Sequence, residues 1–172
     1  CDLVPSILAG VGKPDLTTNV LGQKIDMPIF LSPAAMQRLY HYEGDKASAR
    51  AAEKFGTFYS MSTMATSSIE EVSSISDGPK LFQLYIHKDQ SLTDNLIDRC
   101  KNSGFKALCL TVDTVVAGNR EKDHRTGFTT PPKLTLKSIM SFMMHPVWSL
   151  NYFTHDKFEL ANVSHFTKKG SS

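Results

Sequence analysis

The chain has 172 residues, of which 41% are hydrophobic and 21% are charged. These fractions are typical of a soluble globular domain with a real core, and they exclude disordered and collagen-like proteins. The 19 basic and 17 acidic residues leave a formal net charge of +2. Nucleic acid is therefore not expected as a partner.

Cysteine usage and hydropathy indicate the compartment. Cys1, Cys100 and Cys109 have neither metal-ligand spacing nor a disulfide framework, so we expect a reducing, cytoplasmic location. Cys109 lies in an apolar run, where it is expected to pack as a small hydrophobe. No run of 18 apolar residues marks a transmembrane helix. Residue 1 is not Met, which suggests a trimmed or unsequenced amino end.

The first third of the chain predicts a hairpin, a strand and a helix. Gly22 allows a tight turn between two extended stretches within residues 17–30. Residues 27–33 form a short apolar run closed by Pro, which is typical of a buried strand. Residues 44–56 are rich in Ala, Lys and Glu and end in Gly, so they predict a helix.

Strands and helices continue to alternate up to residue 114. Further strands are predicted at 57–63, 81–86 and 107–114, and helices are predicted to start at Ser67 or Ser68 and to cover 89–104. Strand starts near residues 27, 57, 80 and 107 recur every 23 to 30 residues with a helix in each gap. This is the rhythm of βα units, which form a parallel sheet.

The absence of a glycine-rich phosphate fingerprint after the first strand favours a barrel over an open doubly wound sheet. The fold class is therefore α/β, a partial TIM (β/α)8 barrel with about four βα units and the long loop after the fourth strand. We divide the chain into an N-terminal segment and hairpin (1–26), the first half of the barrel (27–125) and an extended loop (126–172). A full barrel needs about 250 residues, so the chain is expected to be incomplete.

Ligand sites of parallel α/β folds lie at the carboxyl ends of the strands. Ser62, Gln83 and Thr111 are neutral hydrogen-bonding groups at three such ends, and they suit the polar edge of a flat heterocycle. Each one alone is more often a satisfied core residue, but their recurrence at corresponding places favours a ligand. The candidate residues at the strand ends and in the next loop are Pro33, Ala34, Ala35, Ser62, Gln83, Tyr85, Thr111, Asp113 and Arg120.

Charged and phenolic candidates suit an organic acid. Tyr85 offers a hydroxyl, and the planar fork of Arg120 can bind a carboxylate through two hydrogen bonds. A surface ion pair with Glu121 or Asp123 explains Arg120 equally well. Asp113 lies inside an apolar strand, where a carboxylate needs a cation or a donor such as histidine. The six histidines lack ligand spacing, so no metal site is expected.

From about residue 4 to residue 128 the sequence resembles the amino-terminal half of the FMN-dependent α-hydroxy acid dehydrogenases and oxidases, the L-lactate dehydrogenase type included. The resemblance rests on four stretches in order, which are VLGQKIDMPIFLSPAAM, EGDKASARAAEKFGTFYSMSTMATSSIEEV, FQLYIHKD and LTVDTVVAGNREKD.

The resemblance implies roles for the candidates. Pro33, Ala34 and Ala35 correspond to backbone against the flavin ring, and Ser62, Gln83 and Thr111 correspond to residues that hydrogen-bond the ring. Tyr85 and Arg120 correspond to substrate-binding residues. Asp113 matches the aspartate that steadies the catalytic histidine. That histidine, a second substrate arginine and the phosphate-binding residues correspond to positions outside this chain.

The implied activity is FMN-dependent oxidation of a small L-2-hydroxy acid, most readily L-lactate, to the 2-keto acid. Oxygen, a quinone or a cytochrome accepts the electrons, and the full protein is expected to form a homo-oligomer. The fragment alone is expected to be inactive. Met64 stands where glycolate oxidase-like members have Trp, so glycolate, mandelate or a long-chain acid remain alternatives. A silent half-barrel flavin-binding or scaffold protein is the other alternative.

The apolar stretch 139–153 has two interpretations. Met, Phe and Trp side chains near Lys133, Lys137 and Lys157 are compatible with peripheral contact with the inner face of a membrane. A loop that covers the active site, buried against the rest of the protein, is the plainer interpretation.

Overall fold

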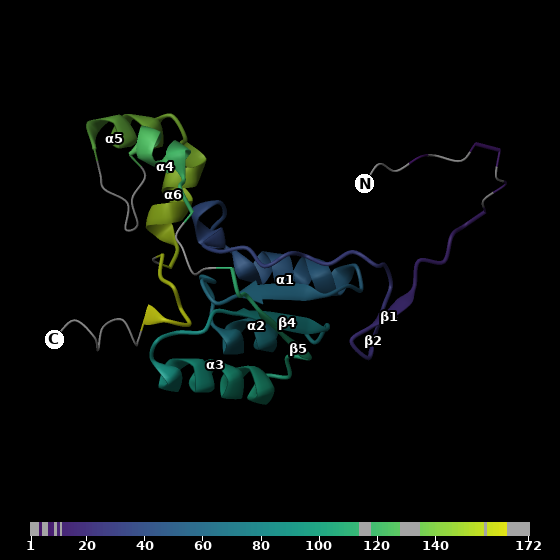
Figure 1. Ribbon diagram of the computed structural model, residues 1–172. Coiled ribbons are helices and arrows are strands. Elements are labelled where there is room, and N and C mark those ends of the chain that lie inside the picture. The colour runs from purple at the N-terminus through teal and green to yellow at the C-terminus, as the bar shows by residue number, and fades with distance from the viewer. Residues whose placement is uncertain are drawn as a thin grey trace.

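The computed structural model describes residues 4, 7–8, 10, 12–113, 118–127, 135–156 and 158–164. An antiparallel hairpin comes first, with β1 (Thr18–Val20) paired to β2 (Gln23–Ile25). Leu21 and Gly22 in the turn have φ of 50° and 73°, the left-handed values that a tight two-residue turn requires. The predicted hairpin is confirmed, and it lies at the amino ends of the main strands (Figure 1).

The main sheet has three parallel strands in the order β3-β4-β5. They are β3 (Tyr59–Ser62), β4 (Lys80–Leu84) and β5 (Ala107–Leu110). Every residue of β3 and β4 is buried, as expected for parallel strands covered on both faces. The predicted parallel sheet is therefore present, with one helix in each connection.

The strand expected at residues 27–33 is reduced to a single bridge. Leu31 pairs in parallel with Tyr59, its N–H donates to Phe58 O at 3.1 Å, and its carbonyl accepts from Ser60 N at 3.2 Å. Pro28 and Pro33 flank this bridge. Because proline has no N–H to donate, a longer ladder cannot form across either end.

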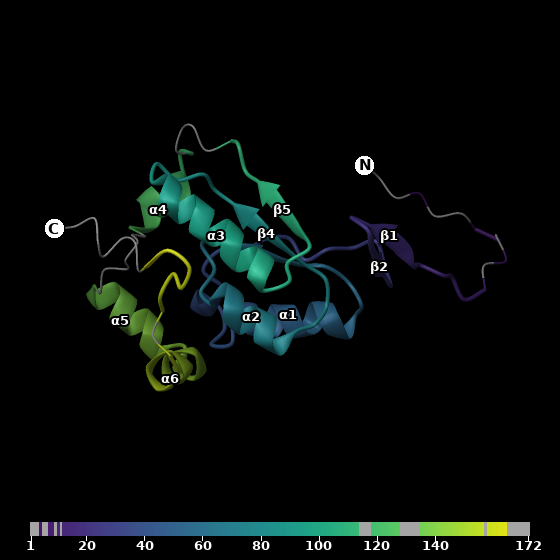
Figure 2. The same cartoon turned by 90° about the horizontal axis from the view of Figure 1, so that it is seen from below.

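Three helices cover the sheet, as predicted: α1 (Asp45–Lys54), α2 (Ile69–Ile75) and α3 (Gln90–Asn102). α1 packs against β3 and α2, and α2 packs against α3. Ser68 and Glu71 form a capping box at the start of α2, which satisfies two amide groups of the first turn. Figure 2 shows the three helices together on one side of the sheet. The largest core cluster joins these helices to β3 and β4 through Ala49, Met61, Ile69, Phe82, Leu96 and Cys100.

β5 ends earlier and is more open than expected. The strand stops at Leu110, and Asp113 lies beyond it in irregular backbone. Cys109 is exposed, so the prediction that it packs in the core is wrong. Within the described part of the chain β5 pairs only with β4, and its other edge and outer side chains have no cover. Cys100, in contrast, is buried, and burial raises the pKa of its thiol to about 12.

The region after residue 126, expected as an extended loop, contains two helices. α5 (Leu136–Met143) begins at a capping box of Thr135 and Ser138, and α6 (Pro146–Thr154) has Pro at its first position. Both are standard helix starts. A short helix, α4 (Glu121–Thr126), precedes them. We call α5 and α6, which pack together, the α5–α6 hairpin; it lies at the carboxyl end of the sheet (Figure 1).

The chain then returns to the helices of the sheet. Leu160 and Val163 join the main core cluster. The buried side chain of Asn162 accepts from Ile69 N at 3.1 Å and donates to Ser67 O at 3.2 Å. Its oxygen also accepts from Arg99 at 3.2 Å. We call these contacts the Asn162 clamp, because they join α2, α3 and a segment more than 60 residues away.

Candidate active site

A line of hydrogen bonds crosses the carboxyl end of the sheet. Ser62 and Gln83 are register partners on β3 and β4, and Thr111 directly follows β5. Ser62 Oγ donates to Gln83 Oε1 at 3.1 Å, and Gln83 Nε2 donates to Thr111 Oγ1 at 2.7 Å. The sequence predicted these three residues at corresponding places, and the structure brings them together. We call them the polar ladder.

The polar ladder keeps donors for a ligand. Ser62 Oγ uses its single proton on Gln83 Oε1 and also accepts from Met64 N at 3.1 Å. The second N–H of Gln83 and the hydroxyl proton of Thr111 have no acceptor in the described part of the chain. Two free donors on a buried, prearranged edge suit the ring carbonyls and nitrogens of a flavin. This donor set therefore fits FMN.

The segment of Pro33, Ala34 and Ala35 lies exposed at the same end of the sheet. Met36, in a left-handed conformation with φ of 56°, donates from its N–H to Met64 O at 3.1 Å. This bond holds the segment beside the end of β3. Small side chains here leave the backbone open, as contact with the face of a flat ring would require.

A buried carboxylate fastens this end of the fold. Asp45 is 0% exposed and accepts from Tyr59 Oη at 3.0 Å, from Gln37 Nε2 at 3.1 Å and from Thr66 N and Oγ1 at 2.9 and 2.7 Å. Ser67 N donates to it at 3.2 Å. Burial, with Asp45 alongside, raises the pKa of Tyr59 far above its usual value, so its hydroxyl remains a donor.

Sequence reasoning missed the Asp45 network. An acidic residue in the first turn of a helix is ordinarily a solvated partner of the helix dipole, and nothing local distinguishes Asp45 from that case. Its partners Gln37 and Tyr59 lie 8 and 14 residues away. Gln37 Nε2 also lies 3.5 Å from Ala34 O, so the network reaches the segment expected to contact the flavin.

Tyr85 is held at the end of β4 by its backbone. Thr63 Oγ1 donates to Gln83 O at 2.6 Å and accepts from Tyr85 N at 3.2 Å. This links the ends of β3 and β4 below the Tyr85 side chain, which is partly buried. The position suits a phenol that lines the mouth of the site.

Asp113 and Arg120 are both exposed. The expectation that Asp113 is a buried carboxylate within a strand is wrong, because β5 ends at Leu110 and water can solvate the charge. Arg120 is the N-cap residue of α4. Among the residues that the structure describes it makes no ion pair, and Glu121 pairs instead with Arg125 at 3.3 Å. The surface ion pair weighed for Arg120 is thus not formed.

Among the described residues, Tyr85, Asp113 and Arg120 form no hydrogen bond or ion pair with one another, and residues 114–117 lie outside the described part of the chain. The described residues hold no group of three His, Cys, Asp or Glu side chains that could bind a metal ion. His87 Nε2 is buried near the end of β4 without a hydrogen-bond partner.

Comparisons of sequence identify relatives. A family model described as FMN-dependent dehydrogenase matches residues 1–171. Glycolate oxidase 1 of Zea mays is 50% identical over 135 residues, which cover 78% of this chain and 37% of that protein. The glycolate oxidase of Spinacia oleracea is 49% identical with the same coverage of 78% and 37%.

Comparisons of structure agree. The crystal structure of the monotopic membrane protein (S)-mandelate dehydrogenase matches with a TM-score of 0.83 and 34% identity, covering 92% of this chain and 42% of that one. The lactate oxidase of Pediococcus acidilactici, itself described as putative, matches with a TM-score of 0.70 and 36% identity, covering 84% and 40%.

This chain spans 37% of the length of the glycolate oxidases that it matches. Its α/β fold agrees with part of a TIM barrel, and FMN is the cofactor indicated by the family. The chain belongs to the FMN-dependent dehydrogenase family.

Proposed function

We propose that the protein containing this chain oxidises a small L-2-hydroxy acid, first of all L-lactate, to the 2-keto acid with FMN. The observation that carries the proposal is the polar ladder, because it presents free donors at the carboxyl end of a parallel sheet. Solved relatives named for mandelate and lactate, and curated ones named for glycolate, all bear the names of 2-hydroxy acids.

Each candidate residue has a task in this proposal. Bound FMN supplies the acceptor for two electrons from the substrate. Gln83 and Thr111 would hold the polar edge of its ring through their free donors, with Ser62 fixing the carboxamide of Gln83. Arg120 binds the substrate carboxylate and Tyr85 orients the acid. Asp113 stabilises the protonated form of a histidine base that the family resemblance places outside this chain.

Met64 bears on which acid the site accepts. Its side chain is partly buried and packs on the main core cluster, beside the segment expected to contact the flavin. Methionine is smaller than the tryptophan of glycolate oxidase-like members, and it is flexible. This leaves room for the methyl group that distinguishes lactate from glycolate, and a larger acid remains the alternative.

Anaerobic mixing of the flavin-loaded, full-length protein with L-lactate tests the proposal. We expect flavin absorbance to bleach, with kcat/KM higher for L-lactate than for glycolate or mandelate. Arg120→Lys keeps the charge but loses the fork, so kcat/KM should fall at least tenfold, by about 1.4 kcal/mol. Arg125→Lys is the matched control and should change little. Residues 1–172 alone should show no turnover.

Absence of bleaching by any 2-hydroxy acid in a protein that binds FMN would favour the silent flavin-binding alternative. Assays with oxygen, a quinone and a cytochrome as the acceptor identify the electron partner. We further propose a homo-oligomer in the cytoplasm, which light scattering after gel filtration checks.

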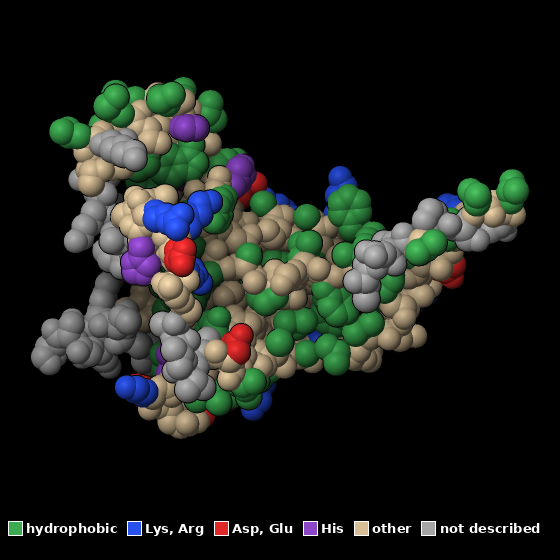
Figure 3. Space-filling view, turned by 45° about the horizontal axis from the view of Figure 1, so that its top comes forward, with side chains coloured by type: hydrophobic (Ala, Val, Ile, Leu, Met, Phe, Trp, Pro, Cys, Tyr) green, Lys and Arg blue, Asp and Glu red, His purple; other side chains and the backbone are tan. Residues whose placement is uncertain are grey.

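Peripheral membrane contact is a second proposal, favoured by the α5–α6 hairpin. Its large apolar side chains are exposed, and Figure 3 shows them at the upper left. They are Leu136, Ile139, Met140, Met143, Met144, Val147, Leu150, Tyr152 and Phe153. Isolated exposed apolar residues are normal, but a contiguous patch marks an interaction surface. None of the helices in the described ranges is long and apolar enough to cross a bilayer.

Vesicle sedimentation tests this contact. Phe153→Ser removes an apolar side chain that is 77% exposed on the hairpin, and Phe55→Ser removes one that is 57% exposed at the end of α1. We expect only Phe153→Ser to weaken binding to vesicles. Equal binding of both variants would support the other interpretation, a loop that covers the active site.

A further inference from the structure

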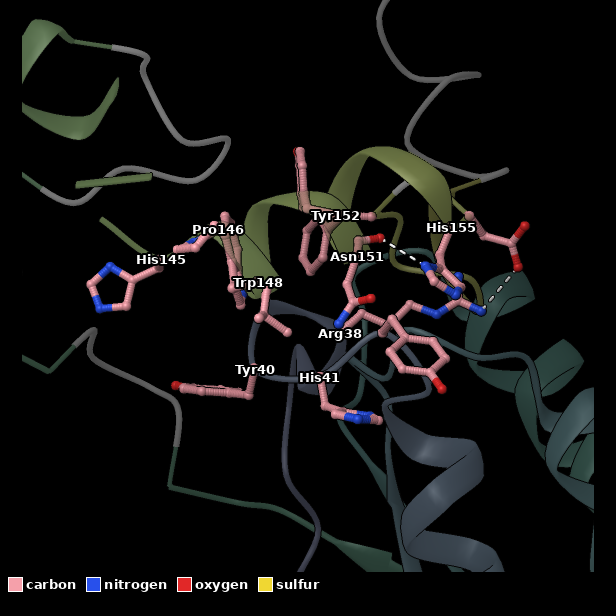
Figure 4. A pocket seen from close by; sticks show the side chains of 13 residues that line it. Arg38, Tyr40, His41, His145, Pro146, Trp148, Asn151, Tyr152 and His155 are labelled. Carbon is pink, nitrogen blue, oxygen red and sulfur yellow. Dashed lines mark hydrogen bonds and ion pairs between the residues drawn. The ribbon is translucent and has the colours of Figure 1, made fainter. Parts of the chain in front are cut away.

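Two adjoining cavities lie between the loop after β2 and the α5–α6 hairpin. One has a volume of about 420 Å³ and is lined by Arg38, His41 and His155; the other, of about 680 Å³, is lined by Ile139, Met143 and Phe153. Trp148 and Tyr152 of α6 line both cavities. Figure 4 shows Arg38, Tyr40 and His41 facing α6 across the first cavity. The first cavity contains the charged and imidazole side chains, so we call it the polar cavity, and we call the second the apolar cavity.

The polar cavity holds an arginine with unused donors. The Arg38 side chain is only 11% exposed, and its Nε is buried without a hydrogen-bond partner. Among the residues that the structure describes, its ion-pair partner is Asp156, at a long distance of 3.5 Å, and the Asp156 side chain is 81% exposed. A planar guanidinium with free N–H groups matches the oxygens of a phosphate or carboxylate, and either one could replace the weak contact with Asp156.

Aromatic side chains wall the apolar cavity. The ring of Trp148 stacks between those of Phe142 and Tyr152, with centroids 5.2 Å away on each side. Trp148 Nε1 donates to Leu39 O at 2.9 Å, which fixes the stack against the sheet-bearing part of the molecule. The space beside this wall is lined mainly by apolar side chains, which suits a hydrocarbon chain.

The sequence of the hairpin and the residues before it is basic, which favours an anionic ligand. From residue 124 to residue 155 the sequence contains Arg125, Lys133, Lys137 and three histidines but no Asp or Glu. Asp123 and Asp156 border this stretch, and Asp156 lies at the edge of the polar cavity. A basic segment that also exposes apolar side chains suits the surface of an anionic membrane.

We propose that the two cavities form a binding site for one anionic phospholipid, with the phosphate on Arg38 and one acyl chain in the apolar cavity. The inference rests on the proposed membrane contact and gives that contact a lipid specificity. It makes Arg38 a specific head-group ligand, in addition to the general attraction of basic residues for the surface.

Binding to vesicles of phosphatidylcholine, with and without phosphatidylglycerol, tests the head-group contact. Phosphatidylglycerol should lower the Kd for vesicles. The Arg38→Gln variant should bind the vesicles that contain phosphatidylglycerol about tenfold more weakly than the wild type does. Arg50→Gln is the control, because it deletes the same charge at an exposed site on α1, where Arg50 pairs with Glu43. It should weaken binding to the vesicles by less than about threefold. Equal losses in both variants would overturn the head-group site and leave general electrostatic attraction.

Quenching by brominated acyl chains tests the chain contact. Trp148 is the single tryptophan of this sequence, and its contribution is identified by the signal lost in Trp148→Phe. Brominated phosphatidylglycerol should quench Trp148 in the wild type and much less in Arg38→Gln. Vesicle binding without any quenching of Trp148 would refute the lipid site while the membrane contact stands. Absence of vesicle binding would refute both.

Discussion

The βα region, residues 44–113, and the α5–α6 hairpin use their side chains in opposite ways. In the βα region, polar groups such as Asp45, Ser62 and Gln83 are buried and hydrogen-bonded, and most of the large apolar residues outside β5 are buried or partly buried. In the hairpin, nearly every large apolar residue is exposed. Both segments have helices with proper starts, so the difference does not come from local structure.

The buried groups of the βα region contribute to stability, whereas the exposed apolar face of the hairpin is suited to recognition. Buried polar groups are tolerated when each has a partner, and in the βα region those partners come from distant loops and strands. An exposed apolar face contributes little to folding, since its surface stays in water. The βα region should therefore be sensitive to single substitutions and the hairpin insensitive, and the following predictions test that difference in order of decreasing effect.

Asp45→Ala should give the largest loss of stability. It leaves Tyr59 Oη and the amides of Thr66 and Ser67 buried without an acceptor, which should lower the free energy of unfolding by about 3 kcal/mol or more. Urea unfolding measures the change. Asp98→Ala, at a site where the side chain is 70% exposed, is the control and should cost less than about 0.5 kcal/mol. Similar losses for the two would contradict the contrast.

Asn162→Ala should come next. Ile69 N and Ser67 O lose their partner, and the free energy of unfolding should fall by about 2 kcal/mol. Asn95, exposed on α3, provides the matched control, since Asn95→Ala should be neutral or slightly stabilising in a helix. If Asn162→Ala left the free energy of unfolding unchanged, the Asn162 clamp would not contribute to stability.

Glu70→Gln should have a smaller and pH-dependent effect. Two hydrogen bonds of 2.7 Å from the Arg99 guanidinium hold the pKa of Glu70 below its usual value of 4.5. The stabilisation is therefore complete above that usual value and is lost as pH falls through the lower pKa of the folded state. Solvent screening limits it to about 1 kcal/mol. Unfolding curves of both proteins should converge in acid; a difference that persists there would refute the assignment.

Leu150→Ser should have the smallest effect. The side chain is 64% exposed on α6, so the free energy of unfolding should change by less than about 0.5 kcal/mol. Leu96→Ser, at a fully buried position of α3, is the contrasting variant and should cost several kcal/mol. A large loss for Leu150→Ser would mean that the hairpin face is packed in solution.

What the sequence could predict depended on whether the signal was local. The parallel strands, the start of α2 at Ser68 and the corresponding places of Ser62, Gln83 and Thr111 were predicted from local patterns, and the structure contains all of them. The exposure of Cys109 could not be predicted from the sequence, because the burial of a strand depends on which other elements cover it. Asp45 and Asn162 were missed since their partners are distant in sequence.

The Asn162 clamp has a consequence for biosynthesis. Ile69 N and its acceptor are 93 residues apart, so α2 and α3 leave the ribosome well before Asn162 is made. At about 5–20 residues per second, the first turn of α2 waits several seconds for its partner. Chaperones that meet the nascent chain in that interval encounter a sheet whose helices are in place but not yet fastened together.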